Sequence, residues 1–104
     1  MIKIYDKLVR DKIPAIIEEQ GKTVHITKAE GISLTHYFDT KLKEELNEYY
    51  ENGEVEELAD LVEVIYALLF HKGVSLEEFE NIREQKNQER GSFKEGIILK
   101  SVEN

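Results

Sequence analysis

The sequence has 104 residues, which is enough for one domain over residues 1–104 with a modest hydrophobic core. Its net charge of −8 argues against binding to nucleic acid polymers, because that binding depends on basic residues that neutralise phosphates. The absence of cysteine excludes disulfides and thiolate metal sites, and no apolar run is typical of a membrane span or a signal peptide, so we expect a cytoplasmic protein without membrane association.

The N-terminal third predicts one short helix and one extended segment. Pro14 suits the first turn of a helix and Gly21 the residue after its end, and the isoleucines between them follow helical spacing. We therefore expect a helix near 13–20. The sequence TVHI at 23–26 predicts a short extended segment.

The centre of the chain predicts a helical hairpin. A second helix is expected to begin after Ser33, a suitable N-cap, and to run to about residue 51. Asn52 and Gly53 favour a tight turn, and a third helix is expected over 55–71. A turn this short makes the two helices antiparallel neighbours.

The C-terminal third predicts a helix followed by a strand. SLEE at 75–78 has the pattern of a capping box, so a fourth helix begins there and continues towards Gly91. The tail at 96–102 predicts a strand that could pair with 23–26. The expected fold is mostly α, with four helices and a small β accessory at the C-terminus.

Two carboxylate pairs lie on the helices of the predicted hairpin, and the partners in each pair are three positions apart: Glu45 with Glu48, and Glu57 with Asp60. A helix turns about 100° per residue, which places Glu45 inside the apolar arc of its helix and Glu48 at the edge of that arc. Glu57 falls among the leucines of the next helix, with Asp60 beside them. Glu44, by contrast, points away from the core. We therefore expect the two pairs to face each other.

Carboxylates that converge in a partly apolar groove repel one another and are costly to desolvate, and a divalent cation removes that cost. A ligand set made only of oxygen favours Mg²⁺, with Mn²⁺ as the alternative, and such an ion lets an acidic protein bind phosphates. A second interpretation is that these acids are solvated surface charges, with Glu45 paired to Lys41 four residues earlier.

The third predicted helix is apolar nearly all the way round. The run LVEVIYALLF at 61–70 contains a single charge, Glu63, so the helix needs to be covered on several sides. One chain of this length has few helices to do so. The sequence therefore predicts a homodimer or a higher homo-oligomer with helix 55–71 at its interface.

The carboxylate pairs form an ExxE motif followed by ExxD, in ELNE at 45–48 and ELAD at 57–60. In this pattern the sequence resembles the all-α nucleoside triphosphate pyrophosphohydrolase superfamily, which includes MazG, the dimeric dUTPases and phosphoribosyl-ATP pyrophosphohydrolase. YDKLVRDKIPAII near the N-terminus and IREQKNQERGSF near the C-terminus are similar to a small MazG-like branch, often labelled phosphoribosyl-ATP pyrophosphohydrolase-like. Ser92 departs from that branch, where a glycine is expected.

The resemblance implies a MazG-like fold and Mg²⁺-dependent hydrolysis between the α and β phosphates of a nucleotide. The products would be a nucleoside monophosphate and pyrophosphate, and the role would be removal of nonstandard nucleotides. The resemblance also implies that Glu45, Glu48, Glu57 and Asp60 are the metal ligands and catalytic residues. Two alternatives stay open: hydrolysis of phosphoribosyl-ATP in histidine biosynthesis, and a non-catalytic helical module that oligomerises or regulates a partner.

Cationic residues on the fourth predicted helix are candidates for binding the phosphates of a nucleotide substrate. Lys86 and Arg90 lie four residues apart on one helical face, with Asn87 beside them. The alternative is that these residues pair with Glu84 and Glu89 on the surface.

Lys7 and Arg10 supply a second group of positive charges near the N-terminus. They are candidates for binding substrate phosphates as well. Arg10 could instead act as a structural lock that holds the first helix to its neighbours.

Overall fold

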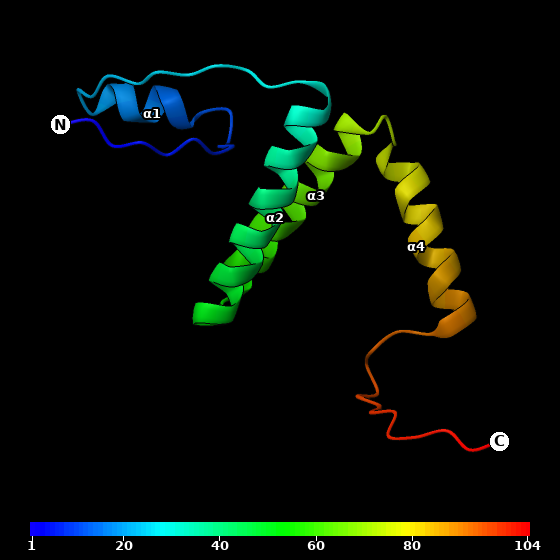
Figure 1. The fold of residues 1–104 in the computed structure, drawn as a ribbon. Helices are drawn as coiled ribbons and strands as arrows, with labels where there is room; N and C mark the ends of the chain where they lie inside the picture. The colour runs from blue at the N-terminus through cyan, green and yellow to red at the C-terminus, as the bar shows by residue number, and fades with distance from the viewer.

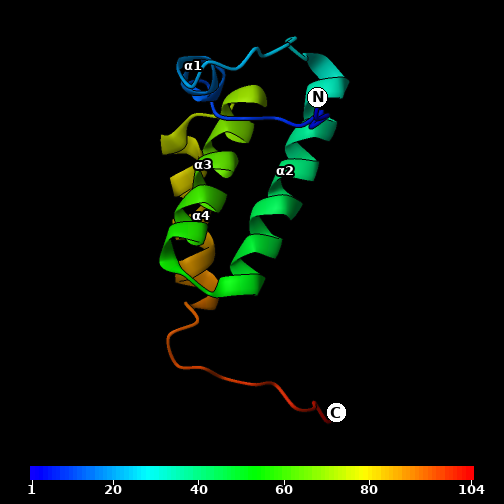
Figure 2. The same cartoon turned by 90° about the vertical axis from the view of Figure 1, so that its left-hand side faces the viewer.

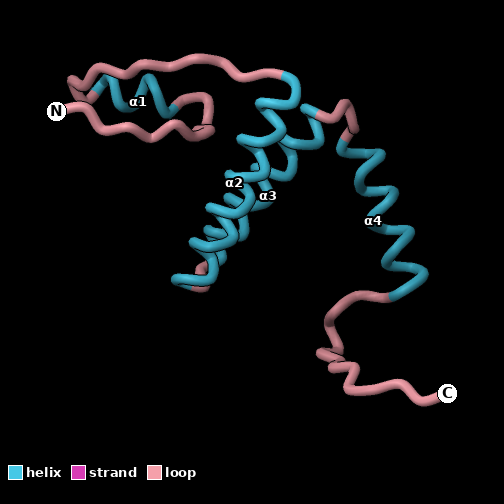
Figure 3. Tube along the Cα trace, in the orientation of Figure 1, coloured by secondary structure: helices cyan, strands magenta, loops and turns pink.

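The computed structural model describes residues 1–104 as four helices joined by loops, without a β-strand. The helices are α1 (Ile13–Glu19), α2 (Gly31–Asn52), α3 (Val55–His71) and α4 (Leu76–Arg90). Figure 1 shows their order along the chain, and Figure 3 shows that the rest of the chain, both termini included, is loop. The prediction of a mostly α protein is confirmed.

α2 and α3 form an antiparallel hairpin, and they lie side by side in Figure 2. The turn between them has the predicted chemistry. Gly53 has a positive φ of 67°, which glycine adopts without steric cost, and its N–H donates to the carbonyl of Tyr49 at 2.7 Å. The side-chain oxygen of Asn52 accepts from the N–H of Glu54 at 2.9 Å. This turn fixes which faces of α2 and α3 meet.

α2 begins three residues before the position that the sequence predicts. Its N-cap is Glu30, in extended conformation, and the N–H of Leu34 donates to the Glu30 carbonyl at 3.4 Å. Ser33 therefore lies inside the first turn and does not cap the helix. The expectation of an N-cap at Ser33 was wrong because the chain turns at Gly31, which has a φ of 60°.

α4 leaves the hairpin at a corner that is well fixed by hydrogen bonds. Gly73 has a φ of 75°, and the N–H of Val74 donates to the Leu69 carbonyl at 3.0 Å, which is the pattern that closes many helix C-termini. The hydroxyl of Ser75 accepts from the N–H of Glu78 at 3.1 Å, so the predicted cap of α4 is confirmed. From this corner α4 diverges from α3 (Figure 1).

The β accessory expected at the C-terminus is not formed in this structure. Residues 96–102 and 23–26 are both irregular. They lie at opposite sides of the molecule in Figure 1, so neither segment has a strand beside it to accept its backbone hydrogen bonds. Alternating or apolar runs predict an extended backbone, but a strand also needs a partner.

Little of the chain is buried. Phe38, Val64 and Glu45 are the three buried residues, and all belong to the α2–α3 hairpin. The radius of gyration is 18.4 Å, against about 13 Å for a compact chain of about 100 residues. None of the four helices combines the length and hydrophobicity needed to cross a bilayer.

Candidate metal centre

Four carboxylates from the two helices of the hairpin meet at one place. Glu45 and Glu48 come from α2, Glu57 and Asp60 from α3, and one oxygen of each lies within 4.8 Å of the others. A spacing of three residues puts each pair on one face of its helix, and the antiparallel hairpin turns the two faces towards each other. The structure thus brings together the four acids as the helical phases predict. We call them the acidic cluster.

Two oxygens of the acidic cluster are buried without a partner. Glu45 is only 8% exposed, and its Oε2 atom accepts no hydrogen bond. Oε2 of Glu57 is also buried and accepts no hydrogen bond. Burying an unpaired carboxylate oxygen costs free energy, because the protein replaces none of the hydrogen bonds lost from water. The cluster therefore has unsatisfied acceptors at its centre.

The Oε1 atoms of Glu45 and Glu57 each have a polar partner. The side-chain amide of Asn52 donates to Oε1 of Glu57 at 3.1 Å, which orients that carboxylate. Lys41 lies 3.4 Å from Oε1 of Glu45. The surface pair considered as the alternative interpretation is therefore formed, but it leaves the inner oxygen of Glu45 unpaired.

The acids of the cluster destabilise one another's charged forms. Partial burial, together with the negative charges of Glu45 and Glu57, raises the pKa of Glu48 above its ordinary value. A raised pKa means that the site favours a proton, or another positive charge, more than water does. The electrostatics of the cluster therefore suit a cation.

An N-terminal segment, residues 6–12, lies against the hairpin beside the cluster. Arg10 donates to Asp60 at 2.7 Å, and Lys7 donates to Glu44 at 2.9 Å. Tyr37 donates to Asp6 at 2.8 Å, which holds the start of the segment to α2. Arg10 thus contacts a member of the acidic cluster directly. Lys7 contacts Glu44, which precedes Glu45 in the chain but is not a member of the cluster.

Glu44 is not among the three buried residues of the hairpin, but its side chain contacts Lys7 of the N-terminal segment. Burial alone would raise its pKa, but hydrogen bonds from Lys7 and Lys41 outweigh burial and lower it. The same hydrogen bond with Glu44 raises the pKa of Lys7. The helical phases describe only the α2–α3 face, so they did not indicate that the N-terminal segment contacts Glu44 on another face of α2.

A cleft of about 400 Å³ lies between the N-terminal segment and the hairpin. Glu45 and Asp60 of the acidic cluster lie on its wall. Its apolar side is formed by Leu8, Val9, Phe38, Val64 and Ala67. Sequence reasoning missed this cleft and the role of Leu8 and Val9 in it. The available signal was the apolar pair Leu8 and Val9, which stands between charged residues in DKLVRDK.

The cations of α4 are not brought to the acidic cluster of their own chain. Lys86, Asn87 and Arg90 are exposed and make no side-chain hydrogen bond or ion pair, and α4 has no contact with α2. The surface pairs with Glu84 and Glu89, which were the alternative for these residues, are not formed either. Only Arg83 is paired, with Glu80 at 2.7 Å. Within one chain these residues therefore do not contact the acidic cluster.

Comparison of the chain with known protein families, with curated proteins and with solved structures found no match. The family resemblance carried by the motifs therefore stays a prediction. The geometry of the acidic cluster supports a cation site, and the reaction proposed for it below comes from the motif resemblance.

Proposed function

We propose that this protein is a Mg²⁺-dependent nucleotide pyrophosphohydrolase with a MazG-like fold. It would cleave a nucleotide between its α and β phosphates and release a nucleoside monophosphate and pyrophosphate, with nonstandard nucleotides as the substrates removed. The observation that carries the proposal is the acidic cluster, in which two buried carboxylate oxygens have no partner. The motif resemblance supplies the reaction.

The ligand set fits a hard divalent cation. All donors are carboxylate oxygens, which Mg²⁺ and Mn²⁺ prefer, and no histidine or cysteine belongs to the group. In an octahedral Mg²⁺ site, opposite ligand oxygens lie about 4.2 Å apart, close to the 4.8 Å within which the four oxygens gather. Glu45, Glu48, Glu57 and Asp60 would hold the ion, and Asn52 would keep Glu57 oriented towards it.

The roles in the reaction follow from the positions of the residues. A divalent cation bound at the cluster supplies charge for a phosphate oxygen and lowers the pKa of an attacking water. Glu48 is our candidate for orienting that water, because it is less buried than Glu45 on the same helix. Arg10 and Lys7 lie beside the cluster, where they can bind the phosphates.

The cleft next to the cluster is the place for the rest of the substrate. Its apolar side, with Phe38 and Val64 deep in the hairpin, suits the flat face of a base or a sugar, and charged residues surround it. A nucleotide lying there would have its phosphates at Asp60 and Glu45, which also line the cleft.

The test is a screen of standard, damaged and phosphoribosyl nucleotides with Mg²⁺ or Mn²⁺, with release of pyrophosphate as the readout. We expect pyrophosphate from at least one nucleotide, loss of this activity in Glu57→Gln, and retention in Glu56→Gln. Glu56 is the matched control because it is the exposed neighbour of Glu57 on α3. A preference for phosphoribosyl-ATP would assign the histidine-biosynthesis reaction. No turnover of any nucleotide would favour the non-catalytic helical module.

A further inference from the structure

Lys41 of α2 has a nearly buried positive charge beside the acidic cluster. Its side chain is 14% exposed, and its Nζ atom lies 3.4 Å from Oε1 of Glu45 and 3.1 Å from Oε2 of Glu44. The ion pairs that do not involve Lys41 join side chains that are 27% to 55% exposed. The pair of Lys41 with Glu45 is therefore the most buried ion pair of the chain.

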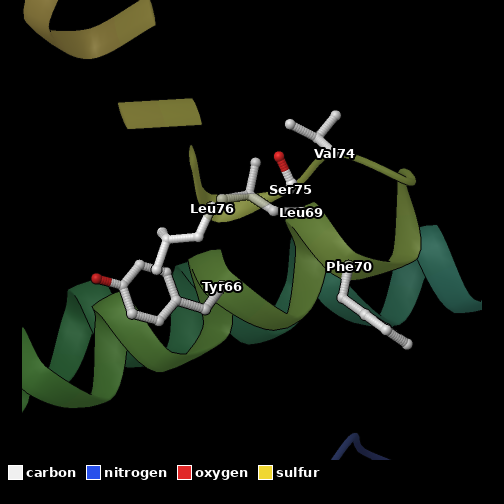
Figure 4. Close-up of a pocket in the computed structure, with 6 residues that line it drawn as sticks. All are labelled: Tyr66, Leu69, Phe70, Val74, Ser75 and Leu76. Atoms are coloured by element: carbon white, nitrogen blue, oxygen red, sulfur yellow. The ribbon is translucent and has the colours of Figure 1, made fainter. Parts of the chain in front are cut away.

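The cleft beside the N-terminal segment collects charged side chains, whereas the hollow at the other end of the hairpin does not. That hollow, of about 250 Å³, lies at the corner between α3 and α4 and is lined by Ser75 and by apolar or aromatic residues such as Tyr66 (Figure 4). The cleft, by contrast, has Lys41, Glu45 and Asp60 on its wall. Lys41 thus shares the cleft with two members of the acidic cluster.

Stability alone does not explain a charge in this position. A buried ion pair is often no more stable than an apolar pair of the same size, because both charges lose their hydration. A lysine on a helix can also extend its ammonium into solvent. Here the ammonium of Lys41 donates to Glu44, and Glu44 in turn accepts from Lys7 at 2.9 Å. These contacts fix Lys41 beside Glu45.

The two oxygens of Glu45 have different surroundings. Oε1 is beside the ammonium of Lys41, and Oε2 is buried without a partner. The same difference is found at Glu57, where Asn52 donates to Oε1 and Oε2 has no partner. Each helix of the hairpin therefore has one glutamate of which a donor outside the cluster holds Oε1, while Oε2 is left unpaired.

We propose that Lys41 is a positioning residue for the metal centre, which holds Oε1 of Glu45 and so leaves Oε2 to bind the cation. The inference rests on the proposed metal centre and assigns a role to a positive charge that would otherwise only repel the metal. Donors that orient a metal ligand strengthen metal binding, and their loss typically costs about 10–100-fold in affinity.

Charge alone predicts the opposite effect. The ammonium of Lys41 repels a divalent cation at the cluster, and this repulsion falls when the charge is removed. Lys41→Met removes the charge and the donors and keeps most of the length of the side chain. If Lys41 only compensates the acids, the variant binds metal more tightly, and if Lys41 positions Glu45, the variant binds metal more weakly. The sign of the change separates the two roles.

The experiment measures the binding of Mg²⁺ and of Mn²⁺ to the full chain by titration calorimetry without nucleotide. We expect the Kd of Lys41→Met to be about 10–100-fold higher than that of the natural chain. Lys41→Arg should recover most of the affinity, because a guanidinium can donate to the same oxygens. Melting without metal shows whether each variant is folded, and Lys41→Ala, which a helix tolerates well, gives the same readout if Lys41→Met is not folded.

Lys43→Met is the matched control. Lys43 is an exposed lysine of the same helix that makes no ion pair, so its loss changes the net charge equally without touching Glu45. We expect this variant to bind metal at least as tightly as the natural chain. A loss of affinity as large as that of Lys41→Met would overturn the proposal, since position on the helix would then not matter.

The other outcomes separate the role of Lys41 from the metal centre itself. If folded Lys41→Met binds metal as tightly as the natural chain or more tightly, the positioning role is overturned and the metal centre stands. Binding by Lys41→Arg that is as weak as by Lys41→Met would also overturn the positioning role. A natural chain that binds neither ion would overturn the metal centre, and the role of Lys41 with it.

Discussion

Among single residues, Glu57 is the one whose charge tests the acidic cluster most directly. Its Oε1 is held by Asn52, and its Oε2 is buried without a partner among three other carboxylates. Glu57→Gln keeps the shape and removes one negative charge. We expect the variant to melt at a higher temperature than the natural protein without metal, because repulsion in the cluster falls.

The same substitution should abolish stabilisation by metal. A ligand present at 100 times its Kd stabilises the folded state by about 2.7 kcal/mol, so millimolar Mg²⁺ should raise the melting temperature of the natural protein measurably. We expect no such rise for Glu57→Gln and a normal rise for Glu56→Gln. If neither Mg²⁺ nor Mn²⁺ changes the melting temperature of the natural protein, the acidic cluster is not a metal centre.

Glu48 predicts a pH dependence of stability. The folded state holds a proton on Glu48 more tightly than the unfolded chain does, because the pKa in the fold is raised above 4.5. The stability that comes with this proton is present below pH 4.5 and is lost as the pH rises through the raised pKa. In metal-free buffer, Glu48→Gln should therefore become more stable than the natural protein as the pH rises above 4.5 through the raised pKa. Urea unfolding at several pH values measures this difference in the free energy of unfolding. A difference that stays constant with pH would mean that Glu48 is not strained by its neighbours.

For single residues, the sequence predicts contacts made within the α2–α3 hairpin, but it does not predict contacts with a segment distant in the chain. The convergence of Glu45 with Glu57 follows from helical phase and a tight turn. The contacts of Glu44 and Asp60 do not, because their partners Lys7 and Arg10 lie 37 and 50 residues away in the chain. No local pattern indicates which face of α2 the N-terminal segment covers.

Among the elements, the N-terminal segment is held to the hairpin partly by an ion pair with Asp60, a carboxylate that would also bind the metal. The pair of Arg10 and Asp60 is partly exposed, so it contributes no more than about 1 kcal/mol to stability. Arg10 nevertheless competes with a cation for Asp60. We expect Arg10→Ala to bind Mg²⁺ more tightly in calorimetry without nucleotide, with little loss of stability, and to bind nucleotide more weakly.

The matched control for Arg10→Ala is Lys22→Ala, which removes an exposed positive charge that makes no ion pair. It tests whether a change in net charge alone strengthens metal binding. Weaker Mg²⁺ binding in the Arg10 variant than in the natural protein would show that Arg10 orients Asp60 for the metal instead of competing with it.

The helix ends illustrate how far local chemistry determines an element. The cap at Ser75 and the turn at Gly53 form as the sequence predicts, because each is completed by atoms within a few residues. The expected strand at 96–102 is not formed, because a strand depends on a partner that no local signal can supply. The direction in which α4 diverges from α3 is set by the backbone geometry at the corner, and the amino-acid composition does not indicate it.

For the whole molecule, the apolar run in α3 predicts from sequence alone that one chain cannot cover all its faces. In the structure Val62, Tyr66 and Phe70 of α3 are exposed. What the sequence does not give is the position of α4, and with it the place of Lys86 and Arg90. Those residues were predicted to bind substrate phosphates, yet they lie away from the cluster of their own chain. They would contact an acidic cluster only in another copy of the chain, within the homo-oligomer that the sequence predicts.

If α4 of one copy in the predicted homodimer binds substrate at the cluster of the other copy, two inactive variants should complement each other. One carries Glu57→Gln and keeps the α4 cations; the other carries Lys86→Ala with Arg90→Ala and keeps the acidic cluster. Each alone should have lost most of its pyrophosphate release. After joint unfolding and refolding, half of the dimers are mixed by statistics, and each mixed dimer has one cluster and one α4 intact from opposite copies, so about a quarter of the natural activity should return. Activity that stays at the level of the separate variants would mean that α4 acts within its own chain or takes no part in binding. Recovery requires that the residues from two chains meet at one site, because neither chain contains both.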